Sequence, residues 1–214
     1  MKIFKKNMIL YAVTDRSWLK EKSLANQVEA AILGGATFIQ MREKSLNIDD
    51  FLREALEIRE VCNKYNIPFV IDDNVEIALK SGADGVHLGQ NDMSITKARE
   101  ILGSEKIIGA TARTVEQALK AEAEGADYIG SGAVFTTSTK TDTVPLSFEN
   151  LSEICNSVNI PVVAIGGICA DNIKMLKGSG ISGVAVVSAI FSAEDVKSAT
   201  ENLKKLSLEM LEEI

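Results

Sequence analysis

The 214-residue sequence predicts a single (β/α)8 barrel, the TIM-barrel architecture, with residues 1–214 forming one domain. Short apolar runs alternate with amphipathic helical patterns from one end of the chain to the other. A glycine phrase recurs before every second apolar run, and no linker, low-complexity tract or change of composition divides the chain. Because such barrels contain roughly 200 to over 400 residues, we expect short loops and little room for a second domain.

Eight apolar runs are predicted to form the strands. They are rich in β-branched residues and do not clearly alternate with polar residues, which is typical of parallel strands buried on both faces. In chain order they cover Ile9–Thr14, Phe38–Arg42, Pro68–Asp72, Gly85–Gly89, Lys106–Thr111, Tyr128–Gly132, Pro161–Gly166 and Gly183–Ser188.

The segments between these runs carry apolar residues at helical spacing, preceded in several cases by helix start signals. Shared helical faces are predicted for Leu24, Val28, Ala31 and Ile32, for Leu52, Ala55 and Leu56, and for Val115, Ala118 and Leu119. Capping residues are predicted at Ser94, at Thr114 with Gln117, at Ser147 with Asn150, and at Ser192 with Asp195.

The glycine phrase precedes the second, fourth, sixth and eighth predicted strands. Each glycine can adopt the left-handed conformation that ends a helix and turns the chain into the next strand. A repeat at every second strand–helix unit favours a closed barrel over an open doubly wound sheet. The four copies are Gly35-Ala-Thr-Phe38, Gly82-Ala-Asp-Gly85, Gly125-Ala-Asp-Tyr128 and Gly180-Ile-Ser-Gly183.

The bulk composition argues against several partners. A net charge of −7 and a pI near 4.9 disfavour a nucleic acid or an anionic membrane, which require a basic surface. The three cysteines, Cys62, Cys155 and Cys169, lie far apart without metal-ligand spacing, so a reduced, cytoplasmic protein is expected. The apolar run Met8–Val13 is too short for a signal sequence or a membrane span, and a buried first strand fits it better.

Cations follow the second predicted strand, at the end of the barrel where active sites are found. The phrase is Gln40-Met-Arg42-Glu-Lys44, and alternation places Gln40, Arg42 and Lys44 on one side, facing the barrel mouth. Arginine supplies a planar fork of donors and lysine a point charge, a pair suited to a diphosphate. A solvated charged turn is the alternative interpretation.

Carboxylates follow the third and fourth predicted strands. Asp72 and Asp73 stand at the end of the third strand, and Asp92 follows the fourth. Carboxylates at neighbouring strand ends can hold one Mg²⁺ together with phosphate oxygens of a substrate. Alternatively, Asp73 caps the next helix and Asp92 belongs to a turn.

Hydroxyl groups and glycines follow strands six to eight. The loop 133–147 is the longest connection, which favours a functional lid over a plain polar loop, and it holds Thr137, Ser138, Thr139 and Lys140. Backbone N–H groups near Gly167 and near Val187-Ser188 can bind a phosphate, as phosphate sites recur after strands seven and eight of this fold. A tight turn is the alternative for these glycines.

The single histidine, His87, is predicted to be packed inside the barrel rather than to act as a general base. Without it, no Ser-His-Asp or Cys-His set can be assembled. Thr14-Asp15-Arg16 follows the first strand in place of a glycine-rich dinucleotide fingerprint, so nucleotide redox chemistry is not expected.

Taken together, the strand-end phrases resemble the thiamine phosphate synthase family over nearly the whole chain, from Tyr11 to Ile190. The resemblance implies an Mg²⁺-assisted enzyme that joins 4-amino-5-hydroxymethyl-2-methylpyrimidine diphosphate to a thiazole phosphate and releases pyrophosphate. The most specific phrases are Gln40-Met-Arg-Glu-Lys44, Gly85-Val-His-Leu-Gly-Gln-Asn-Asp92, Gly125-Ala-Asp-Tyr-Ile-Gly130, Thr137-Ser-Thr-Lys140 and Ile165-Gly-Gly-Ile168.

The resemblance also implies roles for individual residues. The pyrimidine diphosphate would be held by Gln40, Arg42, Lys44 and Lys140, and Mg²⁺ by Asp73 and Asp92. The thiazole phosphate would be contacted by the hydroxyl phrase Thr137-Ser138-Thr139, and phosphate groups by Gly167, Val187 and Ser188. Catalysis would consist of stabilising the departing pyrophosphate, chiefly by Arg42, Lys44 and Lys140, without a protein nucleophile or a strong base.

Two positions depart from the family pattern. Asp72 stands where the family usually has Asn, and it adds a negative charge that Mg²⁺, Arg42 or Lys44 must compensate. Thr111-Ala-Arg113 stands where the family usually has Ser-Ala-His, and Thr111 keeps the hydroxyl expected to act on the substrate.

Two other functions are carried as alternatives. A related thiazole tautomerase would use a histidine just after strand five, where this chain has Arg113, which cannot release a proton at working pH. A non-catalytic protein that binds a phosphorylated ligand would bind product tightly without turnover. The sequence is compatible with a homo-oligomer and does not define one.

Overall fold

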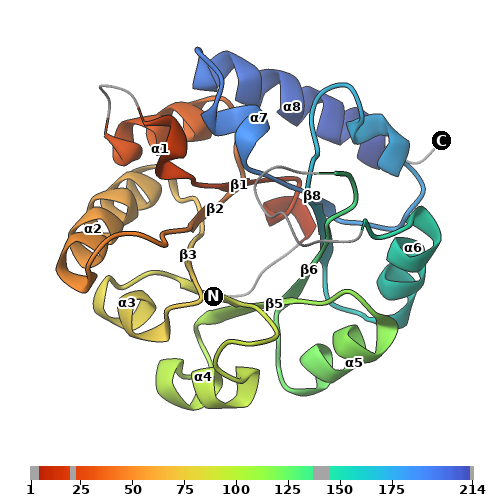
Figure 1. Ribbon diagram of the computed structural model, residues 1–214, viewed down its shortest axis with the longest axis horizontal. Helices are drawn as coiled ribbons and strands as arrows, with labels where there is room; N and C mark the ends of the chain where they lie inside the picture. The colour runs from red at the N-terminus through yellow and green to blue at the C-terminus, as the bar shows by residue number, and fades with distance from the viewer. Residues whose placement is uncertain (1–4, 20–22, 137–144, 213–214) are drawn as a thin grey trace.

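The computed structural model describes residues 5–19, 23–136 and 145–212. Eight parallel strands close into a barrel in chain order, with the first strand paired to the last (Figure 1). This confirms the predicted barrel, and every predicted strand ends within two residues of its expected bounds. The strands are β1 (Leu10–Val13), β2 (Phe38–Met41), β3 (Phe69–Asp72), β4 (Gly85–Leu88), β5 (Ile107–Thr111), β6 (Tyr128–Gly132), β7 (Val162–Ile165) and β8 (Gly183–Val186).

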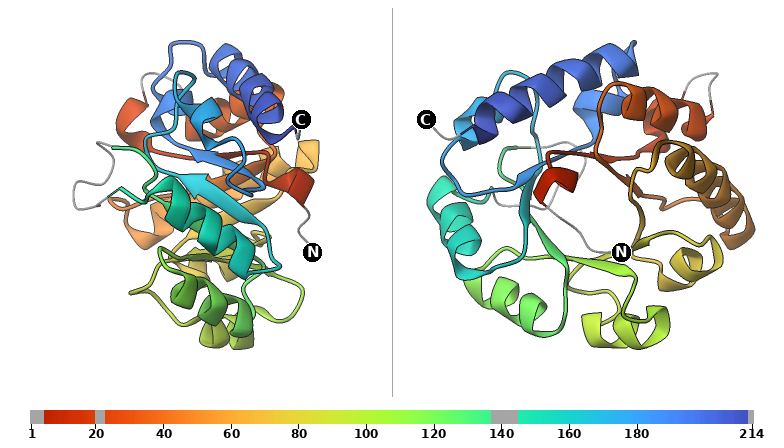
Figure 2. Two further views of the ribbon diagram at one scale, coloured as in Figure 1. Left: turned by 90° about the vertical axis from the view of Figure 1, so that its right-hand side faces the viewer. Right: turned by 180° about the vertical axis from the view of Figure 1, so that it is seen from behind.

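The helices form a ring around the outside of the barrel (Figures 1 and 2). The α-helices of the described residues are α1 (Leu24–Leu33), α2 (Ile48–Tyr65), α3 (Val75–Lys80), α4 (Ile95–Leu102), α5 (Val115–Ala123), α6 (Phe148–Ser157), α7 (Ser188–Phe191) and α8 (Val196–Leu211). Short 3-10 helices are η1 (Lys5–Asn7), η2 (Arg16–Trp18) and η3 (Ile173–Leu176). The repeat is irregular at its end, because β7 is followed by η3 alone and β8 by both α7 and α8.

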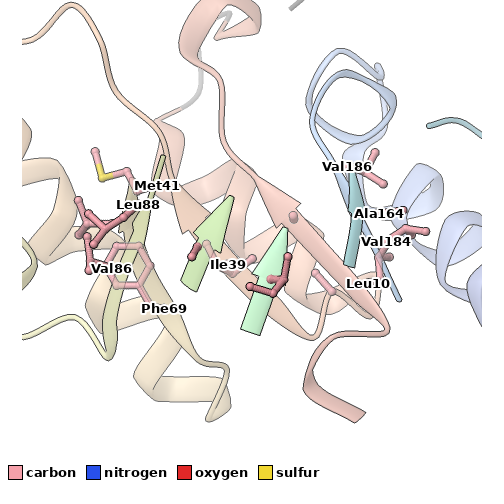
Figure 3. Packing of buried hydrophobic residues seen from close by; sticks show 14 of the residues in the cluster. Leu10, Ile39, Met41, Phe69, Val86, Leu88, Ala164, Val184 and Val186 are labelled. Atoms are coloured by element: carbon pink, nitrogen blue, oxygen red, sulfur yellow. The ribbon is translucent and has the colours of Figure 1, made fainter. Parts of the chain in front are cut away.

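Side chains alternate along each strand, so the barrel has an inner and an outer core. The outer core packs between strands and helices and includes Leu10, Ile39, Phe69, Val86 and Val184 (Figure 3). Burial on both faces explains why the strands are apolar throughout. The inner core fills the barrel with Met8, Tyr11, Val13, Phe38, Val70, Ile107, Tyr128, Val163 and Ala185.

The outer core confirms one predicted helix face and corrects two. All four residues predicted for the face of α1 are buried. Leu56 of α2 and Leu119 of α5 are instead 45% and 46% exposed, and these helices bury Ile58 and Ala121. Both helices carry apolar residues on more than one side. The spacing of these residues along the helix therefore does not predict which side packs against the strands.

Most predicted helix caps are confirmed, and one is wrong. Ser94, Thr114 and Ser147 cap α4, α5 and α6 through their side-chain oxygens. Ser192 does not cap α8, whose N-cap is Asp195. The short helix α7 ends at Ser192, an element that the sequence pattern did not reveal.

The glycine phrase adopts the predicted backbone conformation in all four copies. The φ angles are 100° at Gly35, 67° at Gly82, 95° at Gly125 and 85° at Gly180. These values lie in the left-handed region, where glycine has no steric penalty. In the first three copies the glycine directly follows the C-cap of α1, α3 or α5, whereas Gly180 lies three residues after the C-cap of η3. All four copies lead directly into a strand, β2, β4, β6 or β8.

In two copies the aspartate of the phrase also joins neighbouring elements at the end of the barrel where the strands begin. Asp84 Oδ2 accepts the backbone N–H of Phe69, the first residue of β3, at 2.9 Å and lies 2.7 Å from Arg59 Nη1 of α2. Asp127 Oδ2 repeats this arrangement two units later, 2.8 Å from the N–H of Ile108 in β5 and 2.8 Å from Arg99 Nη2 of α4. The glycine of the repeat was predicted from the sequence, whereas this role of the aspartate was not.

Within the described ranges, the structure contains no helix both long and apolar enough to cross a membrane.

Candidate active site

The cations after β2 line a cavity at the mouth of the barrel. This cavity has a volume of about 360 Å³ and lies between the loops after β1 and β2, lined by residues 15–18 and 42–45. Arg42 and Lys44 are among its lining residues, but Glu43 lines it too, because β2 ends at Met41 and the strand alternation does not continue through the loop. Gln40 is buried within β2, with 6% of its surface exposed, and it is not among the residues that line the cavity.

Glu43 holds the loop after β2 in shape. Its side chain is 3% exposed and accepts the backbone N–H groups of Lys44 at 2.7 Å and Ser45 at 2.6 Å. Arg16 donates to the same carboxylate at 2.8 Å and to Glu54 at 2.7 Å. Although burial opposes ionisation, these donors lower the pKa of Glu43. These contacts of Glu43 were not predicted, because their only signal in the sequence is an acidic residue between two cations.

Asp72 and the two cations form one cluster above β2 and β3. Asp72 Oδ2 lies 3.5 Å from Lys44 Nζ and 3.9 Å from Arg42 Nε. Lys44 is also paired with Asp73. Although burial opposes protonation, the hydrogen bond to Asp73 and the charge of Asp72 raise the pKa of Lys44. The extra negative charge of Asp72 is therefore compensated by protein cations, one of the routes that the sequence analysis expected.

Asp73 and Asp92 lie close together at neighbouring strand ends. Burial and the Asp73 carboxylate raise the pKa of Asp92, whereas Lys44 and Asp92 lower the pKa of Asp73 against the effect of burial. Asp73 has a φ of 61°, a left-handed conformation that is uncommon outside glycine and clusters at functional sites. Asn74 caps α3, so the alternative in which Asp73 is the cap is wrong. Asp92 does act as a turn residue, accepting the N–H of Gly89 at 2.7 Å.

The paired carboxylates fit a magnesium ion whose remaining ligands are water and substrate phosphate oxygens. Among the described residues, no group of three or more His, Cys, Asp or Glu side chains could form a complete protein cage for a metal. Mg²⁺ is usually bound by one or two carboxylates together with water and substrate phosphate. Asp73 and Asp92 meet that requirement, because a bound cation would offset the repulsion between their two carboxylates.

The glycines after β7 support a loop. Gly166 and Gly167 have φ angles of 102° and 66°. A Cβ at Gly167 would lie 2.4 Å from the carbonyl oxygen of Thr136, and one at Gly166 would lie 2.4 Å from Cβ of Ala133. The start of the loop after β6 therefore rests on this glycine pair, a packing reason that the sequence analysis did not contain.

The remaining predicted residues are placed as follows. Thr111 is the last residue of β5. Val187 directly follows β8 and Ser188 opens α7, so the predicted eighth strand ends two residues early. The residues Thr137, Ser138, Thr139 and Lys140 lie outside the described residues.

His87 lies inside the barrel, as predicted. Its ring nitrogens are 3.0 Å from the hydroxyl oxygens of Tyr128 and Thr111. The hydroxyl oxygens of Tyr11 and Tyr128 lie 2.8 Å apart inside the barrel, a polar role that was not predicted for these two strand residues. Nothing in a local apolar run distinguishes a phenol that packs from one that also forms hydrogen bonds.

Fold and site together define a class: a (β/α)8-barrel enzyme with its chemistry at the carboxyl ends of the strands. Residues 10–190 match the family model described as thiamine monophosphate synthase. This chain therefore belongs to the thiamine monophosphate synthase family.

Individual relatives agree with that assignment. The chain is 49% identical over 197 residues to the thiamine-phosphate synthase of Ruminiclostridium cellulolyticum, covering 92% of this chain and 94% of the relative. It is 50% identical over 194 residues to that of Clostridium tetani, covering 91% and 93%. The solved structure of thiamine phosphate pyrophosphorylase from Pyrococcus furiosus superimposes with a TM-score of 0.89 at 42% identity, covering 97% of this chain and 99% of the other.

Proposed function

We propose that this chain is a transferase of thiamine biosynthesis that makes thiamine phosphate. It joins 4-amino-5-hydroxymethyl-2-methylpyrimidine diphosphate to a thiazole phosphate and releases pyrophosphate. The observation that carries the proposal is the meeting of Arg42 and Lys44 with Asp73 and Asp92 at one side of the barrel mouth. Cations suit a diphosphate, and the acidic pair suits the Mg²⁺ that accompanies it.

The two substrate phosphate groups are assigned to different sets of residues. Arg42 and Lys44, joined by Lys140, bind the diphosphate. Gln40 acts on these cations through Asp72. Its amide donates to the Asp72 carboxylate, which lies beside Arg42 and Lys44. The phosphate of the thiazole is assigned to the hydroxyl loop and the ends of β7 and β8, that is, to Thr137, Ser138, Thr139, Gly167, Val187 and Ser188.

The metal site of this proposal consists of Asp73 and Asp92. A bound Mg²⁺ supplies positive charge that offsets the developing charge of the leaving pyrophosphate. Asp92 is held toward the site by its bond to the Gly89 N–H, and Asp73 by Lys44.

The reaction requires stabilised charge rather than a protein nucleophile. The bond between the methylene carbon and the diphosphate oxygen breaks, and the electron-rich aminopyrimidine stabilises the resulting carbocation. The thiazole nitrogen then forms the new carbon–nitrogen bond. Arg42 and Lys44 stabilise the departing negative charge, and the barrel mouth aligns the two rings. His87 is engaged with Tyr128 and Thr111 inside the barrel, consistent with a reaction that does not need it as a base.

The direct test mixes purified protein with Mg²⁺ and both substrates and measures thiamine phosphate and pyrophosphate. We expect the two products in equal amounts and no product in EDTA. Rearrangement of a thiazole substrate alone would instead support the tautomerase, for which Arg113 is a poor proton carrier. Binding of thiamine phosphate without any turnover would support the non-catalytic alternative.

A further inference from the structure

The loop after β2 is folded around one oxygen of a carboxylate. Glu43 Oε1 accepts the backbone N–H of Lys44 at 2.7 Å and that of Ser45 at 2.6 Å. It also accepts the N–H of Leu46 at 3.2 Å and the Ser45 hydroxyl at 2.8 Å. Successive N–H groups that converge on one point form the kind of turn that binds anions. Here the protein supplies its own anion, so the turn is formed before any ligand binds. We call this segment, residues 43–46, the Glu43 turn.

The second oxygen of Glu43 is held by Arg16, from the loop after β1. Arg16 Nε lies 2.8 Å from Glu43 Oε2, and Arg16 Nη2 lies 2.7 Å from Glu54 Oε1 on α2. Both oxygens of Glu43 are therefore in use. Glu54 uses only one, because its buried Oε2 has no hydrogen-bond partner among the residues that the structure describes. The two glutamates thus share one arginine, but only Glu43 also holds the turn.

The Glu43 turn carries one of the two cations at the mouth and directly follows the other. The backbone N–H of Arg42 donates to Thr14 Oγ1 at 3.0 Å, which fixes the chain to the end of β1 just before Glu43. The side chain of Lys44 is 51% exposed, and its ammonium is carried on a flexible stem. Where the ammonium can reach therefore depends on where the Lys44 backbone lies. Holding that backbone in advance lowers the cost of ordering when an anion binds.

We infer that Glu43 is a positioning residue for the diphosphate: it fixes the backbone from which Lys44 reaches the leaving group. This inference rests on the proposed function. The side chain of Glu43 is 3% exposed, so it acts through the turn rather than on the substrate. The N–H groups of the turn already bind this carboxylate, so the diphosphate is bound by the side chains of Arg42 and Lys44. Arg16 holds Glu43 in the orientation that the turn requires.

Glu43→Gln and Glu54→Gln make the same change on the two carboxylates that share Arg16. At position 43, the amide has one acceptor oxygen for two sets of donors, so its NH2 group must face either Arg16 or the N–H groups of the turn. At position 54, one acceptor oxygen is enough for Arg16, and the NH2 group replaces an oxygen that has no partner among the described residues. Only Glu43→Gln should therefore disturb the turn, and Glu54→Gln is its matched control.

Amide hydrogen exchange, followed by NMR, tests the turn without any substrate. We expect the N–H groups of Lys44, Ser45 and Leu46 to exchange about tenfold faster in Glu43→Gln than in the unaltered protein. Glu54→Gln should leave their exchange unchanged. Equal exchange in all three proteins would overturn the inference, because the turn would then not depend on Glu43.

Steady-state kinetics tests the role of the turn in the reaction. Glu43→Gln should raise the KM for the pyrimidine diphosphate roughly tenfold, while the KM for the thiazole phosphate changes less than about twofold. Glu54→Gln should change neither KM. Arg16→Lys keeps the charge but not the fork that spans two carboxylates, so it should raise the KM for the diphosphate by a smaller factor. It decides the question should Glu43→Gln fail to fold. A fall in kcat with both KM values unchanged, or an equal rise in both, would overturn the inference.

Failure of the proposed function would look different. If the unaltered protein makes no thiamine phosphate, the proposed function is wrong, and calorimetry with inorganic pyrophosphate and Mg²⁺ then measures the role of Glu43. The affinity for pyrophosphate should still fall roughly tenfold in Glu43→Gln and stay unchanged in Glu54→Gln. Equal affinities in the unaltered protein and in Glu43→Gln would overturn the role of Glu43.

Discussion

The two ends of the barrel use the same kinds of residue in opposite ways. Where the strands begin, Asp84 and Asp127 each meet one arginine and one backbone N–H. Where the strands end, Asp72, Asp73 and Asp92 gather around Lys44 and Arg42. The first arrangement satisfies each carboxylate locally, which stabilises the fold. In the second, burial and the neighbouring Asp73 carboxylate raise the pKa of Asp92, as expected where an ion or substrate supplies the missing countercharge.

The largest expected effect is on activity at the mouth. Asp92→Ala should lower the turnover of thiamine phosphate synthesis by about 100-fold or more, because it removes half of the proposed metal site. Turnover would be measured at saturating substrate, together with the melting temperature, which should change little. Asp49→Ala, at an exposed position of α2, is the matched control and should retain activity. Full turnover of the unaltered protein in EDTA would contradict the metal assignment.

The next effect is on stability at the opposite end. Asp84→Ala should destabilise the fold by about 2–3 kcal/mol, because Arg59 and the backbone N–H of Phe69 both lose their hydrogen bond to this carboxylate. The melting temperature should fall by roughly 4–10 °C. Turnover per folded molecule should stay the same, since the substitution is far from the mouth. If turnover fell while the melting temperature held, the division of labour between the two ends would be wrong.

A smaller stability effect should come from the glycine phrase. Gly82 has a φ of 67°, and a Cβ there would meet nothing within 4 Å, so its only constraint is the left-handed backbone. Gly82→Ala should cost about 1–2 kcal/mol, whereas Gly82→Asn should cost less because asparagine tolerates this conformation. Chemical denaturation of both variants would measure the difference. Equal losses would show that the backbone conformation is not the reason for the glycine.

The smallest effect tests charge crowding directly. Burial and the Asp73 carboxylate raise the pKa of Asp92, so ionisation of this carboxyl opposes folding. The opposition grows as pH rises from the ordinary pKa of an aspartate to the raised one and is constant above it. Without metal at neutral pH, Asp92→Asn should therefore raise the melting temperature slightly, by an amount that vanishes in acid. Adding Mg²⁺ should stabilise the unaltered protein and not the variant. A variant less stable than the unaltered protein in EDTA would argue against crowding.

Most of the fold can be predicted from the sequence, because strands and turns depend on the types of residue within a short segment. Strands appear as β-rich apolar runs, and glycines mark the left-handed turns of the repeat. The predicted face of α5 failed at Leu119, where only packing against the strands decides which side is buried. The position of Ser192 likewise depended on α7, a helix too short to show a period.

The candidate site was predictable where its residues follow strand ends. Arg42, Asp73 and Asp92 carry that signal, whereas Gln40 lies within β2. The hydrogen bond between Tyr11 and Tyr128 was not predictable, because the two residues are 117 positions apart and meet only when the barrel closes. Glu43 was missed for a related reason, since its partner Arg16 lies on a different loop.

Closure of the barrel also has a consequence for synthesis on the ribosome. Seven of the eight strand pairs join neighbours in the chain, but the last joins Leu10–Ala12 to Val184–Val186. One edge of β1 therefore stays unpaired until nearly the whole chain has been translated, and closing that long loop is slow. Exposed strand edges pair with other chains. A nascent chain halted before β8 should consequently present two open edges and aggregate, rather than fold into a smaller barrel.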